Sequence, residues 1–554
     1  MRATGSMLQT AQGLILRTSR LERLSQAGAL PFNPWNETAG LPERDTRLRY
    51  RYVDLRRSSL QHLLQTRAWA LQQLRMSLTT QGFMEVETPL LERYSPQSTT
   101  AFLVPWTGKE SFALPQSPQL FKQLLMIGGC DRYFQLARSF RREVGLSAYR
   151  QLEFTSLDLE MSFITEEDLF EAVEGALGRI WERITGSTLP ALVPHLTWDE
   201  ALVRYGTDTP DLRFGLELAD ILDLALSDGS AALQEALRSP PQPGPGVRVL
   251  KVDAEHAELL TRQRLDSLNM MNPYPRETRI TWAAVDSPPG GGAPLLEGPM
   301  SALLTFGAVS PLLQRLGAEP GAILIFIYGK NHHFVTSTSG QVRTQLGKEL
   351  NLIDNRKNVL VWVGGFPYFE YDLDNRGFKP ARHPFTEPRQ EFESLLRSLS
   401  PLQRSTTWQG TGMPPSRGSN QARQTLRYGD GSREQLIQVR THGYELVLNG
   451  IEVGTGSLRC HDLALQERVL SMFGYTRESV EERFGVLLEA FRAGVPPHGG
   501  ISIGIDRVLA ELTGVRDIGE LNAFPKNNQG KCAMTGAPSV IDPDFVKMLL
   551  RLDS

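Results

Sequence analysis

The chain has few of the residues that build disulfide frameworks or metal clusters. Its three cysteines, Cys130, Cys460 and Cys532, show no pairwise spacing of a zinc site or a disulfide framework. A reducing compartment is therefore expected. The sequence also lacks an apolar run long enough to span a membrane, so no membrane partner is expected.

A strong excess of either charge is missing as well. The formal net charge is −3, which excludes a uniformly basic surface, so any contact with RNA has to come from local patches. The best candidate is RLRYRYVDLRR at residues 47–57, where arginines alternate with tyrosines. A solvated linker is the alternative for this segment. At 554 residues, the chain is long enough for about two to four domains.

The clearest chemical motif is GGISIGIDRVLAELTG at residues 499–514. Its isoleucines alternate with small residues, which predicts a buried strand, and Asp506 and Arg507 then open an apolar helix. An arginine at such a strand-to-helix junction is well placed to bind phosphate oxygens. Taken alone, the motif also fits a helix-start arginine that is paired with a surface carboxylate.

A second motif lies in residues 133–163, which we interpret as a strand, a charged loop and a returning strand. The loop contains Arg141, Arg142, Glu143, Arg150 and Gln151. Arginine suits a phosphate site because its planar guanidinium stays charged and can bind phosphate through two N–H groups. Taken alone, a salt-bridged hairpin with a solvated tip explains this segment better.

A third group of residues surrounds Asn449-Gly450, which is the strongest short signal for a β-hairpin. Such a turn pairs Val447 with Glu452 and so places Glu445 on the same face as Glu452. Two carboxylates with few other protein ligands suit magnesium, which keeps several waters and is completed by substrate phosphates. Two glycines that follow suggest a β-bulge. A polar, exposed sheet face is the competing interpretation.

Together these motifs resemble those of one enzyme family. GFMEVETP at residues 82–89, together with residues 138–163 and 499–514, is similar to the three motifs of the class II aminoacyl-tRNA synthetases. RLRYRYVDLRR and YGTDTPDLRFG, at residues 205–215, narrow the resemblance to the aspartyl-tRNA synthetases of the bacterial and mitochondrial type. The resemblance covers the chain from about residue 13 to the C-terminus. It implies an α+β fold in which an antiparallel catalytic sheet is flanked by helices and carries an inserted α+β domain.

The resemblance also implies an activity and partners. An enzyme of this family uses ATP and Mg²⁺ to convert L-aspartate to aspartyl-adenylate, and then transfers the aspartyl group to the 3′ end of tRNA(Asp). No side chain has to act as a covalent nucleophile, because catalysis comes from holding the aspartate carboxylate in line with the α-phosphate. A homodimer is expected, with a leucine-striped helix at about residues 60–78 and the strand after it at the interface.

Residue roles follow from the same resemblance. Arg141 and Arg507 are the expected catalytic residues, which hold the α- and γ-phosphates of ATP. The other expected nucleotide contacts, with Phe154 stacked on adenine, are Glu143, Gln151, Phe154, Glu452, Gly504, Ile505 and Asp506. The aspartate pocket, in which Arg459 grips the side-chain carboxylate, is expected to consist of Gln97, Gln119, Lys122, Asp158, His383 and Arg459. Magnesium is expected at Glu445 and Glu452.

Composition and resemblance together suggest the domain boundaries. Residues 1–32 resemble the remnant of a truncated N-terminal OB-fold domain that binds the anticodon, and residues 33–59 form a hinge. The catalytic domain is expected at residues 60–221 and 351–554, and the insertion at 222–350, which contains two Pro/Gly clusters. Residues 405–424 are polar and rich in Gly, Pro and Ser, which predicts a flexible loop.

Several positions depart from the family pattern. The substituted positions are Gln97 for a glutamate, Ser156 for a glutamine, Arg382 for the first histidine of a His-His-Pro-Phe-Thr loop, Glu445 for an aspartate and Thr455 for a glycine. These changes are expected to affect the fine positioning of the substrates more than the choice of the substrate amino acid. Two alternatives remain, an ammonia-dependent asparagine synthetase and a catalytically impaired dimeric RNA-binding protein. The insertion and the hinge favour the tRNA enzyme.

The expected location in the cell follows from the overall character of the sequence. Arg2, Arg17 and Arg20, with no acidic residue among the first 21, suit a mitochondrial transit peptide. The same residues overlap the barrel remnant, so a missing true N-terminus is the expected explanation. The mitochondrial matrix is expected, with the cytoplasm as the alternative.

Overall fold

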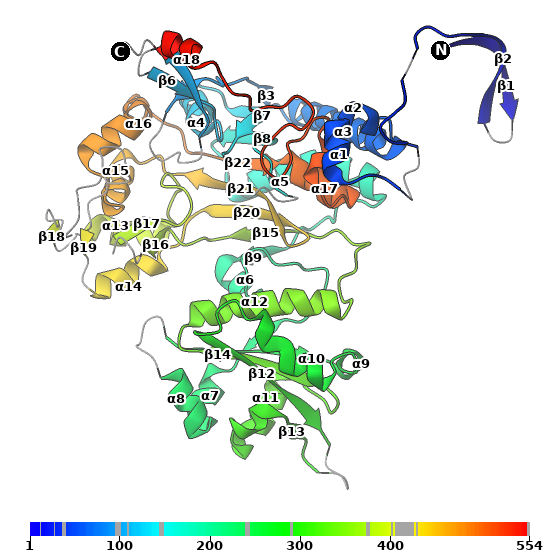
Figure 1. Ribbon diagram of the computed structural model, residues 1–554. Helices are drawn as coiled ribbons and strands as arrows, with labels where there is room; N and C mark the ends of the chain where they lie inside the picture. The colour runs from blue at the N-terminus through cyan, green and yellow to red at the C-terminus, as the bar shows by residue number, and fades with distance from the viewer. Residues whose placement is uncertain are drawn as a thin grey trace.

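The computed structural model describes residues 1–10, 13–26, 28–35, 40–94, 101–107, 110–142, 149–238, 244–287, 292–372, 377–399, 403–404, 426–427 and 430–550. Figure 1 shows a larger upper body, a smaller lower body, and an N-terminal hairpin that stands apart from both. Among the residues described, no helix has the length and apolar character that a membrane crossing requires. The expected loop at residues 405–424 falls outside the described residues.

The upper body is built on an eight-stranded sheet with the order β3-β7-β8-β22-β21-β20-β15-β9. Its strands are β3 (Met84–Glu85), β7 (Arg132–Phe140), β8 (Glu153–Ser162), β22 (His498–Gly504), β21 (Ile451–Arg459), β20 (Gly443–Leu448), β15 (Leu360–Gly364) and β9 (His195–Thr197). The inner neighbours are antiparallel, whereas β3 and β9 pair in parallel at the two edges. This sheet and its helices confirm the expected α+β fold. The strand order also brings the three sequence motifs together in one surface.

Three helices fill one face of this sheet: α3 (Ser58–Thr80), α5 (Glu166–Thr185) and α17 (Ile505–Thr513). Leu74 of α3, Ile180 of α5 and Leu509 of α17 are fully buried in the shared core. The apolar stripe predicted ahead of the first motif is the reason that α3 packs here. Along β22, Ile501 and Ile503 point into this core, so the residues between them face the other side of the sheet.

The hairpin of β20 and β21 has the predicted register. Asn449 and Gly450 both have positive φ, 55° and 83°, as a two-residue turn that matches the strand twist requires. Val447 pairs with Glu452, and the register then shifts by one residue, which is the expected bulge. Because side chains alternate along a strand, Glu445 lies on the face of Val447 and therefore on that of Glu452.

The lower body is a separate five-stranded antiparallel sheet with the order β10-β11-β14-β12-β13. Its strands are β10 (Leu218–Asp220), β11 (Gly246–Val252), β14 (Ile323–Gly329), β12 (Thr278–Asp286) and β13 (Leu295–Glu297). One face packs on α7 (Leu222–Asp228), α8 (Ala231–Leu237) and α11 (Phe306–Leu316), and the other on α9 (Ala254–Ala257), α10 (Arg262–Asp266) and α12 (His332–Glu349). This unit occupies the part of the chain where the insertion is expected, and its first strand begins at Leu218.

A buried arginine links the lower body to the catalytic sheet. Arg343 of α12 is fully buried, and its Nη2 donates to the backbone oxygens of Asp211 at 3.0 Å and Gly215 at 2.8 Å. In the same loop, Arg213 Nη2 donates to the backbone oxygen of Asn449 at 3.4 Å. The loop at residues 205–216 therefore connects α12 to the turn of the β20–β21 hairpin.

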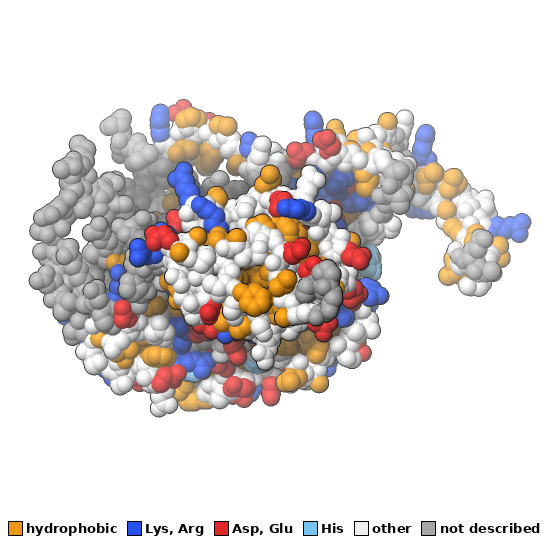
Figure 2. Space-filling model, turned by 90° about the horizontal axis from the view of Figure 1, so that it is seen from below, with side chains coloured by type: hydrophobic (Ala, Val, Ile, Leu, Met, Phe, Trp, Pro, Cys, Tyr) orange, Lys and Arg blue, Asp and Glu red, His pale blue; other side chains and the backbone are white. Residues whose placement is uncertain are grey.

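Charged and apolar side chains are mixed on the lower face of the molecule. Figure 2 shows an apolar patch there, with acidic and basic groups around it rather than a field of one sign. Among the exposed apolar residues of the lower body are Leu226 of α7 and Phe306 of α11. This mixture agrees with the small net charge of the sequence.

The N-terminal residues form a two-stranded hairpin, β1 (Arg2–Thr10) and β2 (Gly13–Glu22). Its side chains are exposed on both faces, as Met7 at 59 % and Leu14 at 67 % show. Two strands without a covered face are marginal on their own. The described residues of 1–35 therefore contain part of a sheet and no closed barrel.

In the arginine-rich segment after this hairpin, three of the five arginines, Arg47, Arg51 and Arg57, turn inward instead of joining an open patch. Asp54 is fully buried, and Arg51 Nη1 and Arg57 Nε lie 2.6 and 2.9 Å from its carboxylate. Arg47 lies 3.5 Å from Glu520. A buried carboxylate needs cations around it, so these arginines serve the fold. Arg49 and Arg56 stay exposed.

The remaining elements surround these sheets. The upper body also contains α1 (Arg44–Arg49), α2 (Arg51–Asp54), β4 (Glu92–Arg93), β5 (Leu103–Thr107), β6 (Glu110–Ala113), α4 (Gln119–Ile127), α6 (Trp198–Tyr205), β16 (Phe369–Asp372), β17 (Gly377–Pro380), α13 (Glu393–Ser398), β18 (Gln403–Arg404), β19 (Leu426–Arg427), α14 (Asp430–Gln438), α15 (Leu463–Met472), α16 (Arg477–Arg492) and α18 (Pro543–Leu550). Helices α13, α15 and α16 share one core with β16 and β17.

Candidate active site

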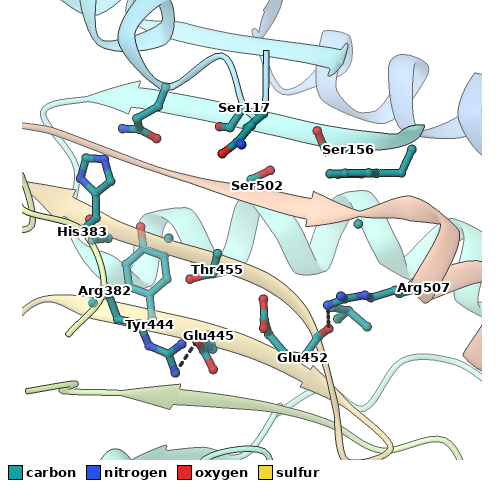
Figure 3. A pocket seen from close by; sticks show the side chains of 18 of the residues that line it. Ser117, Ser156, Arg382, His383, Tyr444, Glu445, Glu452, Thr455, Ser502 and Arg507 are labelled. Carbon is teal, nitrogen blue, oxygen red and sulfur yellow. Dashed lines mark hydrogen bonds and ion pairs between the residues drawn. The ribbon is translucent and has the colours of Figure 1, made fainter. Parts of the chain in front are cut away.

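A cavity of about 450 Å³ opens on the face of the catalytic sheet that the core helices leave uncovered. Along β22, Ser502 and Gly504 line the cavity, whereas Ile501 and Ile503, which alternate with them, belong to the core. Twelve predicted site residues line it: Gln119, Lys122, Arg141, Gln151, Phe154, His383, Glu445, Glu452, Arg459, Gly504, Asp506 and Arg507. Figure 3 shows how side chains from β20, β21 and β22 converge with the loop that carries Arg382 and His383.

Of the four other predicted residues, the two that the structure describes do not line the cavity. Asp158 is fully buried behind the cavity, where the Lys122 ammonium is 3.4 Å from its carboxylate. The side chain of Ile505 belongs to the apolar core, so only its backbone is available to a nucleotide. Glu143 and Gln97 lie outside the described residues.

One end of the cavity carries the two predicted phosphate-binding arginines. Arg507 lies in the first turn of α17, and its Nη1 donates to the backbone oxygen of Glu452 at 2.9 Å (Figure 3). The guanidinium of Arg141 lies over the Phe154 ring, 5.3 Å from its centroid. An aromatic ring beside two arginines suits a nucleotide, because a base can stack on the ring while guanidinium groups bind phosphates.

Asp506, next to Arg507, is fixed by an ion pair with another helix. Its carboxylate is buried and forms an ion pair with Arg67 of α3. Arg67 also donates to the Thr155 hydroxyl at 3.1 Å. This pair ties the long helix α3 to the first turn of α17, so Asp506 positions the backbone that carries Arg507. The sequence pattern had suggested a nucleotide contact for Asp506 and had not singled out Arg67.

The other end of the cavity contains a buried network of charges around Arg459. Its Nε and Nη2 donate to Glu160 at 2.9 and 3.4 Å, Nη2 also to the Gly500 backbone oxygen at 3.3 Å, and Nη1 to the Ser457 hydroxyl at 2.7 Å. The Lys122 ammonium is 3.2 Å from Glu160 and also contacts Asp158. Two cations and two carboxylates therefore balance one another before any substrate is present.

Some N–H groups at this end of the cavity have no acceptor among the residues that the structure describes and can bind a ligand. A guanidinium has five N–H groups and an ammonium has three. Within the described part of the chain, Arg459 donates four hydrogen bonds, and Lys122 donates one to Asp158 and forms an ion pair with Glu160, so each keeps at least one N–H. Both residues line the cavity. The remaining N–H groups suit a ligand group that only accepts hydrogen bonds, such as a carboxylate.

The pKa values of two buried groups support this description. Burial alone raises the pKa of Glu160, but Arg459 and Lys122 outweigh it and lower that pKa to about 2. Burial, aided by Arg459 and Lys122, lowers the pKa of His383 to about 3. His383 is therefore neutral near pH 7. Its Nδ1 accepts the backbone N–H of Phe385 at 3.2 Å, which leaves Nε2 as a hydrogen-bond donor.

Sequence reasoning missed Glu160, although it forms more contacts in this network than any other carboxylate there. Asp158 and Glu160 alternate with apolar residues along β8, so both lie on one face of a buried strand. Two carboxylates on a buried strand face require cationic partners. That pattern is visible in the sequence, but the partners Lys122 and Arg459 are not.

The predicted carboxylate pair is only partly available to a metal. Glu445 is 2 % exposed, and its Oε1 is 2.8 Å from Nη2 of Arg382 (Figure 3). Burial raises the pKa of Glu445 to about 8; Arg382 opposes the rise, whereas Glu452 and Asp208 add to it. Glu452 is partly exposed in the cavity.

A donor set for a divalent cation follows from this arrangement. Among the described residues, no group of three or more His, Cys, Asp and Glu side chains could hold a metal ion. Glu452 fits a hard cation that is completed by substrate oxygens and water. Glu445 does not fit in this structure, because a guanidinium already occupies its carboxylate.

Comparisons with known proteins identify relatives along most of the chain. The family description "tRNA synthetases class II (D, K and N)" matches residues 43–528. The aspartate–tRNA(Asp/Asn) ligase of Caldanaerobacter subterraneus subsp. tengcongensis is 36% identical over 96% of this chain and 81% of its own length. The enzyme of the same name from Synechococcus sp. is 38% identical over 89% of this chain and 76% of its own length.

A solved structure is similar in fold. The asparaginyl-tRNA synthetase of Pyrococcus horikoshii, complexed with asparaginyl-adenylate, superposes with a TM-score of 0.50. The match covers 98% of this chain and 83% of that chain at 13% sequence identity. At this identity, the likeness concerns the fold alone.

Proposed function

The chain belongs to the class II tRNA synthetases of the D, K and N group, and from that membership we propose that it is an aspartate–tRNA ligase. It joins L-aspartate to ATP, forms aspartyl-adenylate and pyrophosphate, and passes the aspartyl group to the 3′ end of tRNA(Asp). The reaction forms a carbon–oxygen bond. The observation that carries the proposal is the cavity itself, which has arginines and an aromatic ring at one end and a buried donor pair at the other.

Selection of aspartate rests on the donors at the buried end. Arg459 and Lys122 each keep at least one N–H, and neutral His383 keeps its Nε2–H. A carboxylate accepts from all of these groups, whereas the NH₂ of a carboxamide would face donors with no acceptor. Leaving such groups unpaired in a buried site is the strongest means of rejecting an analogue. Asparagine is therefore excluded although it has nearly the same shape.

Catalysis depends on position and charge, with no covalent nucleophile. Arg141 and Arg507 hold the phosphates of ATP, and Phe154 stacks on adenine, with further contacts from Gln151 and the backbone at Gly504. Charge that develops at the α-phosphate is offset by guanidinium groups that are already in place. Glu452 would hold a divalent cation together with the nucleotide, and that cation would supply further positive charge at the phosphates.

The proposal is tested by pyrophosphate exchange, with aspartate, asparagine and glutamate supplied separately. Aspartate should support exchange, and asparagine should be weaker by on the order of 10²-fold or more. Arg507→Gln should abolish most of the exchange. Arg492→Gln is the matched control, since it removes an exposed arginine that pairs with Glu467 outside the cavity. Equal exchange with asparagine would contradict the assignment.

A second assay separates the proposed enzyme from an ammonia-dependent asparagine synthetase. Transfer of labelled aspartate is measured with tRNA(Asp), with tRNA(Asn), and with ammonia in place of tRNA. The proposal requires acid-precipitable aspartyl-tRNA with tRNA(Asp). Free asparagine formed from ammonia without tRNA would favour the alternative enzyme.

We also propose that the enzyme works as a homodimer. Strand β3 is an edge of the catalytic sheet; Met84 on this strand is 54 % exposed, and Met76 of α3, the helix that contacts β3, is 49 % exposed. An exposed edge strand with apolar neighbours is a surface that a second copy can cover. Sedimentation velocity of the wild type and of Met76→Glu tests this contact.

The mitochondrial matrix is our proposal for the location, with the cytoplasm as the alternative. It rests on the character of the whole sequence, because the acid-free residues 1–21 overlap the segment that resembles the barrel remnant. Detection of the native protein by antibody in purified mitochondrial and cytosolic fractions tests it, and a signal confined to the cytosol would refute it.

A further inference from the structure

Arg382 lies between two carboxylates at the edge of the cavity. Its Nη2 is 2.8 Å from Oε1 of Glu445 and 3.1 Å from Oδ2 of Asp208. Its guanidinium also lies over the ring of Phe366, 4.6 Å from the centroid. The three contacts come from different segments of the chain, and Figure 3 shows the one with Glu445.

This guanidinium neutralises a carboxylate that has no other partner among the described residues. Glu445 is 2 % exposed, and its Oε1 accepts no hydrogen bond from the described part of the chain. Glu452 and Asp208 add negative charge nearby. A buried carboxyl group is stable as an anion only with a cation beside it and otherwise takes up a proton, as the raised pKa of Glu445 indicates. Either a guanidinium or a metal ion can be that cation.

The two cations exclude each other at this oxygen. A magnesium ion binds a carboxylate oxygen at about 2.0–2.1 Å, which would place it within a few ångströms of the Arg382 guanidinium. In a partly buried site, repulsion between a divalent ion and a unit charge at this distance is large. Glu452, whose carboxylate has no such partner among the described residues, stays open to the metal.

We propose that Arg382 is a resident cation that removes Glu445 from metal binding and leaves Glu452 as the protein carboxylate for the divalent ion. The inference rests on the proposed function only where it takes that ion to be the companion of ATP. The cavity then binds the metal weakly by itself, and the metal arrives with the nucleotide phosphates. Arg382 is a positioning residue, because it acts through Glu445.

The experiment measures binding of Mn²⁺ alone, by the loss of the free-ion signal in electron paramagnetic resonance, with no nucleotide present. Arg382→Gln should bind Mn²⁺ about tenfold or more tightly than the wild type, because the competing charge is gone. Arg382→Lys should stay near the wild type, because it keeps a cation. Arg397→Gln is the matched control: Arg397 also bridges two carboxylates and is 44 % exposed against 42 % for Arg382, but it does not line the cavity.

A second pair of variants keeps the inference testable if Arg382→Gln does not fold. In the wild-type background, Glu445→Gln should change Mn²⁺ affinity by less than about twofold, whereas Glu452→Gln should weaken it about tenfold. The inference is overturned if Glu445→Gln weakens Mn²⁺ binding as much as Glu452→Gln does. It is also overturned if Arg382→Gln leaves the affinity unchanged.

The wild-type preparation is assayed in parallel for aspartate-dependent pyrophosphate exchange. Exchange with unchanged Mn²⁺ affinity in Arg382→Gln would refute the role of Arg382 and leave the proposed function standing. Tighter Mn²⁺ binding in Arg382→Gln without wild-type exchange would support the role of Arg382 and refute the proposed function.

Discussion

Replacing Arg459 by leucine should damage both substrate selection and stability, and the structure allows the two effects to be separated. Arg459 is 4 % exposed and makes four hydrogen bonds, two of them to the fully buried Glu160. Its loss removes the guanidinium that would face the substrate carboxylate. Aspartate-dependent exchange should fall by on the order of 10²-fold or more, as when one preorganised donor is removed.

The cost in stability follows from the partner that is left behind. Arg459 and Lys122 lower the pKa of Glu160 from its ordinary 4.5 to about 2. At 1.36 kcal/mol per pKa unit, this lowering corresponds to about 3 kcal/mol of stability in the folded protein. Removing one partner of a buried pair typically costs about 3–5 kcal/mol, which agrees in magnitude. The urea midpoint of Arg459→Leu should therefore fall clearly.

The stability that this interaction contributes should depend on pH, in a direction set by the pKa shift of Glu160. The folded pKa of Glu160 is depressed, so its contribution is fully present above the unfolded value of about 4.5 and is lost as the pH falls towards about 2. In Arg459→Leu, that part of the acid-induced loss of stability should shrink. Urea titrations at pH 7 and at pH 4 measure the difference.

A double variant separates recognition from folding. Combining Arg459→Leu with Glu160→Gln removes the buried carboxylate that has lost its partner. Most of the lost stability to urea should then return, while exchange stays low. Arg459→Lys should retain part of the stability but rescue exchange poorly, because a point charge does not reproduce the planar fork. Near-normal exchange in Arg459→Leu would refute the role of this residue. Recovery of exchange in the double variant would show that the loss came from unfolding.

Three further predictions concern other parts of the chain. Glu452→Gln should raise the Mg²⁺ concentration needed for exchange, since a neutral amide is a poorer ligand for a hard cation; an unchanged Mg²⁺ titration would contradict this role. Phe154→Ala should raise the KM for ATP by roughly 5- to 150-fold, because stacking of one base is worth about 1–3 kcal/mol; a rise confined to the KM for aspartate would point to a different role. Charging by this 554-residue chain should respond little to substitution of the tRNA anticodon, because the described residues of 2–22 form a hairpin that is exposed on both faces and closes no barrel; strong anticodon discrimination in charging assays would disprove this.

Local patterns were sufficient for the elements that carry the site. Asn449-Gly450 set the hairpin and its register because a two-residue turn needs positive φ at both positions, and because side chains alternate along a strand. The buried strand before Arg507 and the helix after it were likewise readable from period-two isoleucines and an apolar run. These features depend on neighbours within a few residues.

The partners of the buried charges depended on the tertiary structure. Arg67 meets Asp506, and Arg459 meets Glu160, across hundreds of residues of chain. Arg47, Arg51 and Arg57 turned inward because Asp54 lies beneath them, a fact that composition does not contain. The sequence does not show which residues will cover a charged side chain. Burial decides whether that side chain is solvated, paired with an opposite charge or available to a ligand. The sequence therefore determined which residues could bind aspartate and ATP, whereas packing decided that Arg459 shares its fork with Glu160 and that Arg382 takes Glu445.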